Sequence, residues 1–270
     1  MGLGIAQVCA TGGYQVQLFD LNPEMVKKAL ATIEKNLQAL LEKGRLSETA
    51  LQESQQRLQG AFTLAEIKAD LIIEAIVEKL EPKQALLHAL EHLNPTAILA
   101  SNTSTFPITL VAARLRRPAN CIGLHFFNPA QVMKLVEIIS SDQTDPAWVE
   151  AMRTFCARLE KTSVLAKDSP GFIVNRVARP YYVESLKVLE EEGATFESID
   201  QLMRATGFKM GPFELMDLIG VDTNLAVTTS LYEAFDRAPR FRPSPIQQQK
   251  VAEGCLGRKA GQGFYSYAKE

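Results

Sequence analysis

Two ionisable side chains lie in apolar surroundings within the stretch LHFFNPAQVMKLVEII. His125 ends a predicted apolar strand, and Glu137 lies inside an apolar run. An ionised carboxylate in such surroundings is costly unless it is paired or hydrogen-bonded. A pair with His125 would satisfy Glu137, fix the imidazole tautomer and let His125 act as a general base. The alternative is a core histidine beside a glutamate that faces solvent on an edge strand.

A second polar group, in the stretch ASNTST, follows another apolar strand. Doubly wound folds bind their ligands at the carboxyl ends of parallel strands. Ser104 would hydrogen-bond a substrate oxygen there, and Asn102 would contact a nicotinamide ribose or amide. The other interpretation is that this run caps a short helix over residues 107–114.

The opening segment, MGLGIAQVCATGGYQVQLFD, combines an apolar helix pattern, a GG break and a strand that ends in Asp20. An acidic residue at this place in a βαβ unit accepts both ribose hydroxyls of NAD, although Asp20 also suits an ordinary turn. Gly2 matches the third glycine of G-x-G-x-x-G, where a missing side chain lets helix and strand pack closely. We therefore expect the second half of a dinucleotide-binding unit, lacking its first strand and GxG turn.

The remaining candidates have weaker patterns. His88 and His92 have i,i+4 spacing without an evident third ligand, which predicts solvated helix positions, and no metal is expected. Ser169 lacks the context of a nucleophile elbow. The basic residues are dispersed, which argues against a nucleic-acid groove.

Composition favours a globular protein that acts on a small molecule. The 270 residues are 46% hydrophobic and 22% charged, with a net charge of -2. This balance argues against nucleic acid or an anionic membrane as the main partner. Four scattered cysteines suit a reducing compartment. We expect a cytoplasmic protein without a membrane span.

Short apolar strands alternate with amphipathic helices in the first part of the chain, which is typical of a parallel sheet with crossover helices. Strands are predicted at residues 15–20, 70–74, 97–101, 120–125, 132–140 and 162–166. Helices are predicted at residues 23–41, 47–58, 83–93, 108–114 and 148–159. Helices and turns alone are predicted from Ile173 onward. The fold class is thus α/β: a Rossmann-like doubly wound sheet over residues 1–166, followed by an all-α domain over 167–270.

Seven segments resemble one family, the short-chain L-3-hydroxyacyl-CoA dehydrogenases of the 3-hydroxybutyryl-CoA type. They are GIAQV, IIEAIVE, SNTS, GLHFFNPAQVMKLVEII, DSPGFIVNRVARPYYVE, MGPFELMDLIGVD and GRKAGQGFY, and they follow the family's order across nearly the whole chain. The resemblance implies NAD as cofactor and an acyl-CoA as substrate. It also implies reversible oxidation of an L-3-hydroxyacyl-CoA to the 3-oxoacyl thioester, as in the β-oxidation of fatty acids.

The resemblance assigns a function to individual residues. Catalysis falls on Ser104, His125, Glu137 and Asn175. NAD binding falls on Gly2, Asp20, Glu78, Lys83, Asn102, Ser104, Asn128 and Lys259. Binding of the acyl-CoA substrate falls on Asn36, Lys43, Ser104 and Asn175.

Three further expectations concern assembly, substrate and activity. The family implies a homodimer formed through the C-terminal helical domain. The segments PGFIVNRVARPYY and RFRPSP also resemble the dehydrogenase of phenylacetate breakdown, which handles a dicarboxylic 3-hydroxyacyl-CoA, so the acyl chain is left open. Because the phosphate-binding turn is not seen, a catalytically impaired or crystallin-like relative is the alternative to an active enzyme.

Overall fold

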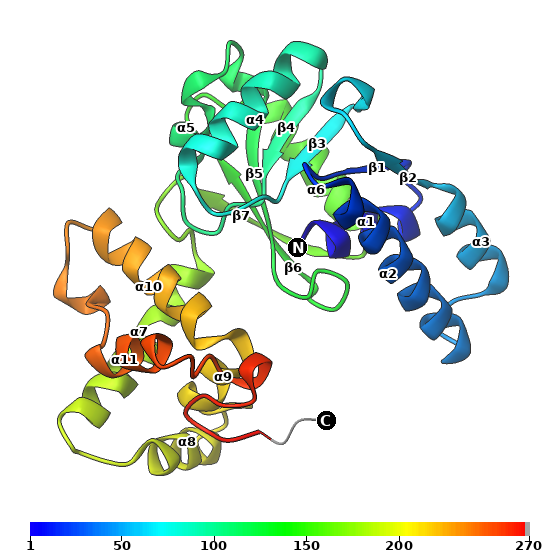
Figure 1. Cartoon of the computed structure of the whole chain (residues 1–270). Helices are drawn as coiled ribbons and strands as arrows, with labels where there is room; N and C mark the ends of the chain where they lie inside the picture. The colour runs from blue at the N-terminus through cyan, green and yellow to red at the C-terminus, as the bar shows by residue number, and fades with distance from the viewer. Residues whose placement is uncertain (268–270) are drawn as a thin grey trace. The chain divides into compact units, whose positions relative to one another are not determined.

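The structure, a computed structural model, describes residues 1–267 and divides the chain into two compact units (Figure 1). Unit 1 spans Met1–Ser169, and unit 2 begins at Pro170. Unit 1 contains strands and helices, whereas the described part of unit 2 contains helices and turns with two isolated bridges. The predicted fold class, a Rossmann-like α/β unit followed by a helical one, is confirmed.

The larger sheet of unit 1 has five strands in the order β3-β4-β5-β6-β7. They are β3 (Leu71–Glu74), β4 (Ile98–Ser101), β5 (Cys121–Phe126), β6 (Leu135–Ser140) and β7 (Thr162–Lys167). Strands β3, β4 and β5 pair in parallel, β6 runs antiparallel to β5, and β7 is parallel to β6. The carboxyl ends of β3, β4 and β5 therefore lie at one edge, where α/β sheets bind ligands.

A separate two-stranded parallel sheet contains β1 (Val16–Phe19) and β2 (Leu58–Ala61). Strand β2 was not predicted, because its sequence LQGA has neither β-branched nor aromatic residues. Among the described strands β1 and β3 do not pair, so unit 1 contains two separate sheets. The Gln17 side chain links β1 to the segment before β3. Its amide donates to the Glu66 carbonyl and accepts the Lys68 N–H.

The helices of unit 1 largely follow the predicted ranges. They are α1 (Gly2–Thr11), α2 (Pro23–Glu42), α3 (Glu48–Gln56), α4 (Leu80–Leu93), α5 (Ile108–Val111) and α6 (Pro146–Arg158). The Asn22 side chain accepts the Glu24 N–H at 3.0 Å, and Ser47 accepts the Ala50 N–H at 3.2 Å, so these two side chains cap α2 and α3. Helix α5 continues as a 3-10 turn over Ala112–Arg114.

The core of unit 1 explains which strand residues are left to face the site. Ile122, Leu124 and Phe126 of β5 are buried in one cluster with apolar residues of α1 and α6. Successive side chains of a strand point to opposite faces, so Gly123 and His125 face the other side of the sheet. A methyl group at Gly123 would come within 2.9 Å of the Ile108 side chain, which places α5 over that face.

Unit 2 packs its helices around a core of its own. Its helices are α7 (Val174–Glu190), α8 (Phe196–Ala205), α9 (Pro212–Ile219), α10 (Val221–Ala234) and α11 (Pro245–Ala252). Two buried carboxylates tie segments together. Asp200 accepts the N–H groups of Phe213 and Glu214, and Asp217 accepts those of the Phe264–Tyr265 turn. Hydrogen bonds from backbone N–H groups and tyrosine hydroxyls thus replace the hydration of these charges.

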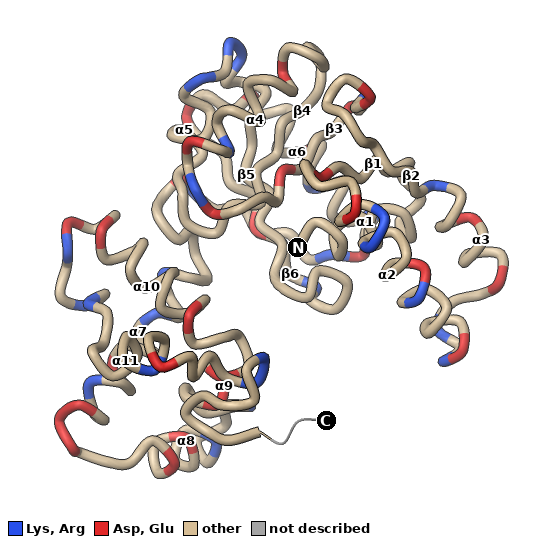
Figure 2. Tube along the Cα trace, viewed as in Figure 1, with Lys and Arg blue, Asp and Glu red and all other residues tan. Residues whose placement is uncertain are grey.

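Charged side chains of both signs are interspersed over both units (Figure 2). Within residues 1–267, no helix is both long enough and apolar enough to cross a membrane.

Candidate active site

His125 and Glu137 form the buried pair that the sequence predicts. They face each other across the antiparallel β5–β6 ladder, and His125 Nδ1 lies 2.7 Å from Glu137 Oε2. The alternative of a solvent-facing Glu137 is wrong, because the carboxylate is buried. Since an ionised carboxylate only accepts hydrogen bonds, Nδ1 carries the proton of a neutral imidazole. In this tautomer Nε2 is the ring nitrogen with an acceptor lone pair.

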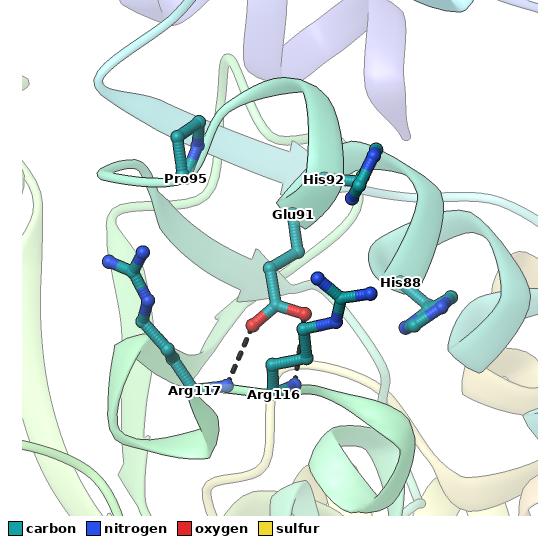
Figure 3. A pocket seen from close by; sticks show the side chains of 6 residues that line it. All are labelled: His88, Glu91, His92, Pro95, Arg116 and Arg117. Carbon is teal, nitrogen blue, oxygen red and sulfur yellow. Dashed lines mark hydrogen bonds between the residues drawn. The ribbon is translucent and has the colours of Figure 1, made fainter.

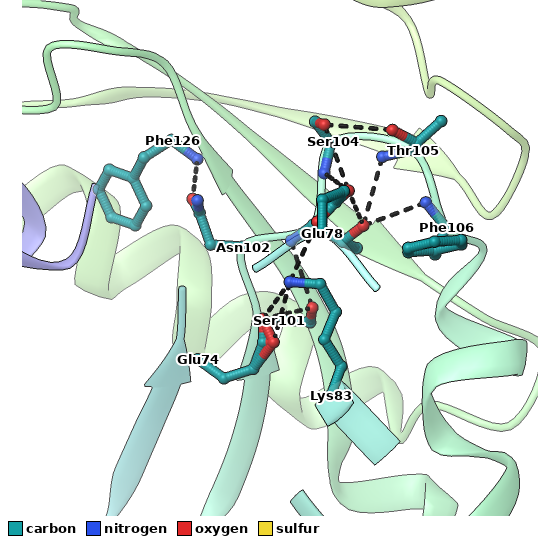
Figure 4. A network of polar contacts seen from close by, with 10 residues as sticks. Glu74, Glu78, Lys83, Ser101, Asn102, Ser104, Thr105, Phe106 and Phe126 are labelled. Atoms are coloured by element: carbon teal, nitrogen blue, oxygen red, sulfur yellow. Dashed lines mark hydrogen bonds and ion pairs between the residues drawn. The ribbon is translucent and has the colours of Figure 1, made fainter. Parts of the chain in front are cut away.

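The loop after β4 is held by one carboxylate oxygen of Glu78 (Figure 4). Glu78 Oε1 accepts the Thr103 hydroxyl at 2.6 Å, the Ser104 N–H at 2.9 Å and the Ser104 hydroxyl at 3.3 Å. Burial raises the pKa of Glu78, but Lys83 and these hydrogen bonds outweigh it and hold the pKa below its usual value. Glu78 therefore stays ionised and fixes the Ser104 backbone.

Lys83 lies beneath this loop and is only 1% exposed. Its Nζ lies 2.6 Å from Glu74 Oε1 and 3.1 Å from Glu78 Oε2 (Figure 4). Glu74 ends β3, is buried and also accepts the Ser101 hydroxyl. Burial raises the pKa of Glu74, and the Lys83 charge opposes that rise. Sequence reasoning missed Glu74, although an acidic residue ending the apolar run LII gives the same signal as Glu137.

Asn102 lies between the ends of β4 and β5. Its Oδ1 accepts the Phe126 N–H at 2.8 Å, so the amide joins two strand ends (Figure 4). The alternative that the ASNTST run caps the next helix is wrong. Asp168 accepts the N–H groups of Ile108 and Thr109 and caps α5 instead.

Asp20 follows β1 as predicted, whereas Gly2 begins α1 without the close contact predicted for it. Asp20 is exposed directly after β1, and its Oδ1 accepts the Asn22 N–H at 2.9 Å. A methyl group at Gly2 would meet no described atom within 4 Å, so the expected close packing is not seen there. Close approach occurs at Gly4 instead, where a methyl group would lie 2.7 Å from Gln131 Oε1.

Three other predicted site residues also belong to unit 1, namely Asn36, Lys43 and Asn128. Asn36 donates to Gln7 Oε1 at 3.0 Å, which ties α2 to α1. Lys43 is exposed at the C-terminal end of α2. Asn128 is exposed, and the peptide bond to Pro129 is cis.

Asn175 and Lys259 belong to unit 2. Asn175 is half-buried in the first turn of α7. Lys259 is exposed, and its Nζ contacts both carboxylate oxygens of Asp222 at 2.6 and 2.7 Å. The predicted site residues are therefore divided between the two units.

Unit 1 has a pocket of about 250 Å³ beside the segments that lead into β4 and β5 (Figure 3). Glu91 Oε2 and Oε1 accept the N–H groups of Arg116 at 2.9 Å and Arg117 at 2.7 Å there. His88 and His92 line the rim from exposed positions on α4. None of the predicted catalytic residues lines this pocket.

Two family models match the chain. The model described as "3-hydroxyacyl-CoA dehydrogenase, NAD binding domain" matches residues 1–169. The model described as "3-hydroxyacyl-CoA dehydrogenase, C-terminal domain" matches residues 171–267. The expected cofactor, NAD, is confirmed by the first of these models.

Similar proteins carry related names. The chain is 44% identical over 273 residues to 3-hydroxyadipyl-CoA dehydrogenase of Escherichia coli, and it spans 58% of that protein's length. It is 38% identical to a probable 3-hydroxybutyryl-CoA dehydrogenase of Bacillus subtilis, where the match covers all of this chain and 95% of the relative. Both names describe dehydrogenases, so neither favours a non-enzymatic relative.

A solved structure supports the same grouping. The (S)-3-hydroxybutyryl-CoA dehydrogenase of Ralstonia eutropha matches with a TM-score of 0.94 and 39% identity, covering 100% of this chain and 96% of that one. The chain belongs to the 3-hydroxyacyl-CoA dehydrogenase family, whose members are NAD-dependent oxidoreductases, and the predicted resemblance is confirmed.

Proposed function

We propose that this chain catalyses the NAD-dependent oxidation of an L-3-hydroxyacyl-CoA to the 3-oxoacyl-CoA. The observation that carries the proposal is the buried His125–Glu137 pair, with 2.7 Å between Nδ1 and Oε2. A histidine held in one tautomer by a buried carboxylate suits general base catalysis. It lies at the carboxyl end of β5, on the edge where this fold class binds its ligands.

His125 supports the proton step. Its Nε2 takes the proton of the substrate's 3-hydroxyl group, and Glu137 stabilises the positive charge that forms on the ring. NAD, when bound, accepts the hydride that leaves C3. In the reverse direction the protonated His125 returns a proton to the 3-oxo oxygen.

Ser104 and Asn175 are proposed to bind the reacting oxygen. The hydrogen bonds of Ser104 to Glu78 fix its backbone, so its hydroxyl is held in one place before the substrate arrives. Asn175 would donate from its amide group. Both act on charge that develops on oxygen during the transfer.

The residues at the carboxyl ends of β1 and β4 fit NAD. Asp20 is an exposed acid directly after β1, as ribose recognition requires. Helix α1 begins at Gly2 with no side-chain cap, which suits a phosphate near its first N–H groups. Asn102 and Asn128 would contact the nicotinamide half. Glu78 would contact NAD directly. Lys83 would act on NAD binding through Glu78, because the Lys83 Nζ is buried between the carboxylates of Glu74 and Glu78.

The remaining assignments complete the proposal. Unit 1 binds NAD, with Asn36 and Lys43 on its α2 contacting coenzyme A. Unit 2 supplies Asn175 and Lys259 and forms the contact of a homodimer. A cytoplasmic location stays a prediction. The acyl tail is the point on which the names of the relatives differ, since a butyryl chain ends in a methyl group and an adipyl chain in a carboxylate.

The direct test follows NADH absorbance with acetoacetyl-CoA as substrate. We expect NADH to be consumed at a rate proportional to enzyme, with loss of that rate in His125→Gln. A folded chain that binds NADH and acetoacetyl-CoA but never oxidises NADH would overturn the proposal.

A further inference from the structure

Arg179 of α7 is a buried charge without a counter-ion. Arg179 is only 2% exposed, and no carboxylate of residues 1–267 forms an ion pair with it. Burial lowers the pKa of Arg179 to about 10, and the neighbouring Tyr182 opposes that shift only in part. This is unusual, because buried charges in proteins are normally paired or bind a ligand.

The hydrogen bonds of Arg179 occupy one edge of its guanidinium group. Nη1 donates to the Asn224 carbonyl at 3.2 Å and to the Thr228 hydroxyl at 3.0 Å, both on α10. Nε is fully enclosed and has no acceptor. Nη2 donates to no acceptor among the described residues either. Nε and Nη2 together form the edge with which arginine binds a carboxylate through two parallel hydrogen bonds.

Contacts within unit 2 do not offset the cost of this arrangement. The Tyr182 ring lies 5.1 Å from Arg179 Cζ, and such a contact is weaker than the loss of hydration of a buried guanidinium. An apolar side chain would fill the same space without a charge to solvate. The arginine is therefore explained better by an anion that binds to it than by packing.

Arg179 lies about one helical turn along α7 from Asn175, the residue proposed to bind the reacting oxygen of the substrate. Asn175 and Arg179 are four residues apart and share one face of the helix, about 6 Å apart along its axis. Three carbon–carbon bonds beyond C3 span roughly 4 Å, at about 1.5 Å per bond. An acyl chain whose 3-oxygen is bound by Asn175 therefore brings a carboxylate at C6 within reach of Arg179.

We propose that Arg179 binds the terminal carboxylate of a dicarboxylic 3-hydroxyacyl chain and so sets the substrate class of this site, a proposal that rests on the dehydrogenase activity proposed above. The Nε–Nη2 edge, which has no acceptor among the described residues, is the recognition element. A substrate with a methyl terminus leaves this edge unpaired and gains nothing from it.

The kinetic test compares 3-hydroxyadipyl-CoA with 3-hydroxybutyryl-CoA for the unaltered chain, Arg179→Met and Arg179→Lys. We expect Arg179→Met to lose about 100-fold in kcat/KM on the adipyl substrate, because a buried site built to bind a polar group discriminates strongly. Its kcat/KM on the butyryl substrate should change by less than about threefold. Arg179→Lys should lie between the two on the adipyl substrate, since it keeps the charge but loses the planar fork.

The matched control is Lys187→Met, which removes an exposed positive charge from the same helix. It should leave both substrates unaffected. Equal losses on both substrates in Arg179→Met would assign Arg179 a structural function and overturn the proposal. Full activity of Arg179→Met on the adipyl substrate would overturn it as well.

A binding measurement separates this proposal from the dehydrogenase activity. Calorimetry with adipyl-CoA and butyryl-CoA, which lack the 3-hydroxyl group, needs no turnover. We expect at least tenfold tighter binding of adipyl-CoA by the unaltered chain and no such preference in Arg179→Met. A preference for adipyl-CoA without any oxidation of a 3-hydroxyacyl-CoA would overturn the activity alone. Equal affinities in the unaltered chain would overturn the assignment of Arg179.

Discussion

Lys83 and Lys259 were both predicted to bind the cofactor, yet the structure gives them opposite surroundings. Lys83 is buried in unit 1 between Glu74 and Glu78. Lys259 lies at the surface of unit 2 against Asp222, and 47% of its side chain is exposed. The same residue type with the same predicted function thus contributes differently to stability. A buried pair must stay intact for the fold, whereas an exposed pair can open at little cost to bind a ligand.

The His125–Glu137 pair resembles the Lys83–Glu74 pair in one respect, because both are buried and hydrogen-bonded within unit 1. Arg179 differs from Lys83, since no carboxylate among the described residues forms an ion pair with it. A charged side chain can thus be paired within the fold or be available to a ligand. The following experiments distinguish these two functions.

The largest effect is expected from His125→Gln. The glutamine amide can still donate to Glu137, so the buried carboxylate keeps a hydrogen bond while the general base is removed. We expect kcat to fall by about a thousandfold with little change in KM for the acyl-CoA. Steady-state NADH kinetics measure it.

The control for His125→Gln is His92→Gln, which changes an exposed histidine of α4. It should keep the full rate. A His125→Gln enzyme within tenfold of the unaltered rate would show that the buried pair is structural and that the base lies elsewhere.

The next effect concerns the stability of unit 1. Lys83→Met leaves Glu74 buried without its counter-ion, and breaking such a pair costs about 3–5 kcal/mol in the free energy of unfolding. The double change Glu74→Gln with Lys83→Met removes both charges and should restore most of that loss. Urea denaturation of the two single variants and the double variant measures the coupling. Additive losses in the double variant would show that the pair does not stabilise the fold.

Sequence reasoning recovered the strands and helices whose apolar periods are long, and it recovered the His125–Glu137 pair from a charge inside an apolar run. It missed β2, whose four residues lack strand propensity and depend on pairing with β1. The resemblance assigned Lys83 to NAD binding, and that assignment stays a prediction. Only the three-dimensional packing shows that Glu74, nine residues earlier in the chain, holds the Lys83 ammonium.

The site residues of unit 2 were harder to assign for a related reason. A buried arginine is visible in the sequence only as one basic residue among many. Its lack of a partner depends on which side chains of α10 lie opposite, and that is a tertiary property. Helix periodicity places Arg179 on the face of Asn175, but it does not show which edge of the guanidinium is occupied.

A smaller effect is expected from Lys259→Met. Because the pair with Asp222 is exposed, its loss should cost less than about 1 kcal/mol in the free energy of unfolding. Binding of NAD should weaken several-fold if Lys259 contacts the cofactor, so NAD affinity and stability change by very different amounts. A loss of stability as large as that of Lys83→Met would contradict the contrast between the two lysines.

The dependence of the free energy of unfolding on pH, in the acid range, tests the Lys259–Asp222 pair further. Burial raises the pKa of Asp222, but the Lys259 hydrogen bond helps to outweigh it and bring the pKa below 3.8. The stabilisation is therefore present above the ordinary pKa of an aspartate and is lost as the pH falls through the lower, folded-state pKa. Lys259→Met should reduce this dependence. An unchanged acid profile would show that backbone hydrogen bonds alone hold the pKa of Asp222 down.

The smallest change is chemical modification of the thiols, which compares the interiors of the two units without a mutation. Cys9, Cys121 and Cys156 of unit 1 are buried, and burial raises the pKa of each thiol to about 12. Cys255 of unit 2 is only half-buried. Since the thiolate is the reactive form, a thiol reagent near neutral pH should modify Cys255 alone in the native protein and all four cysteines in denaturant. Rapid reaction of the unit 1 thiols would show that unit 1 opens under native conditions. The buried pairs Lys83–Glu74 and His125–Glu137 would then be less protected from water than their packing indicates.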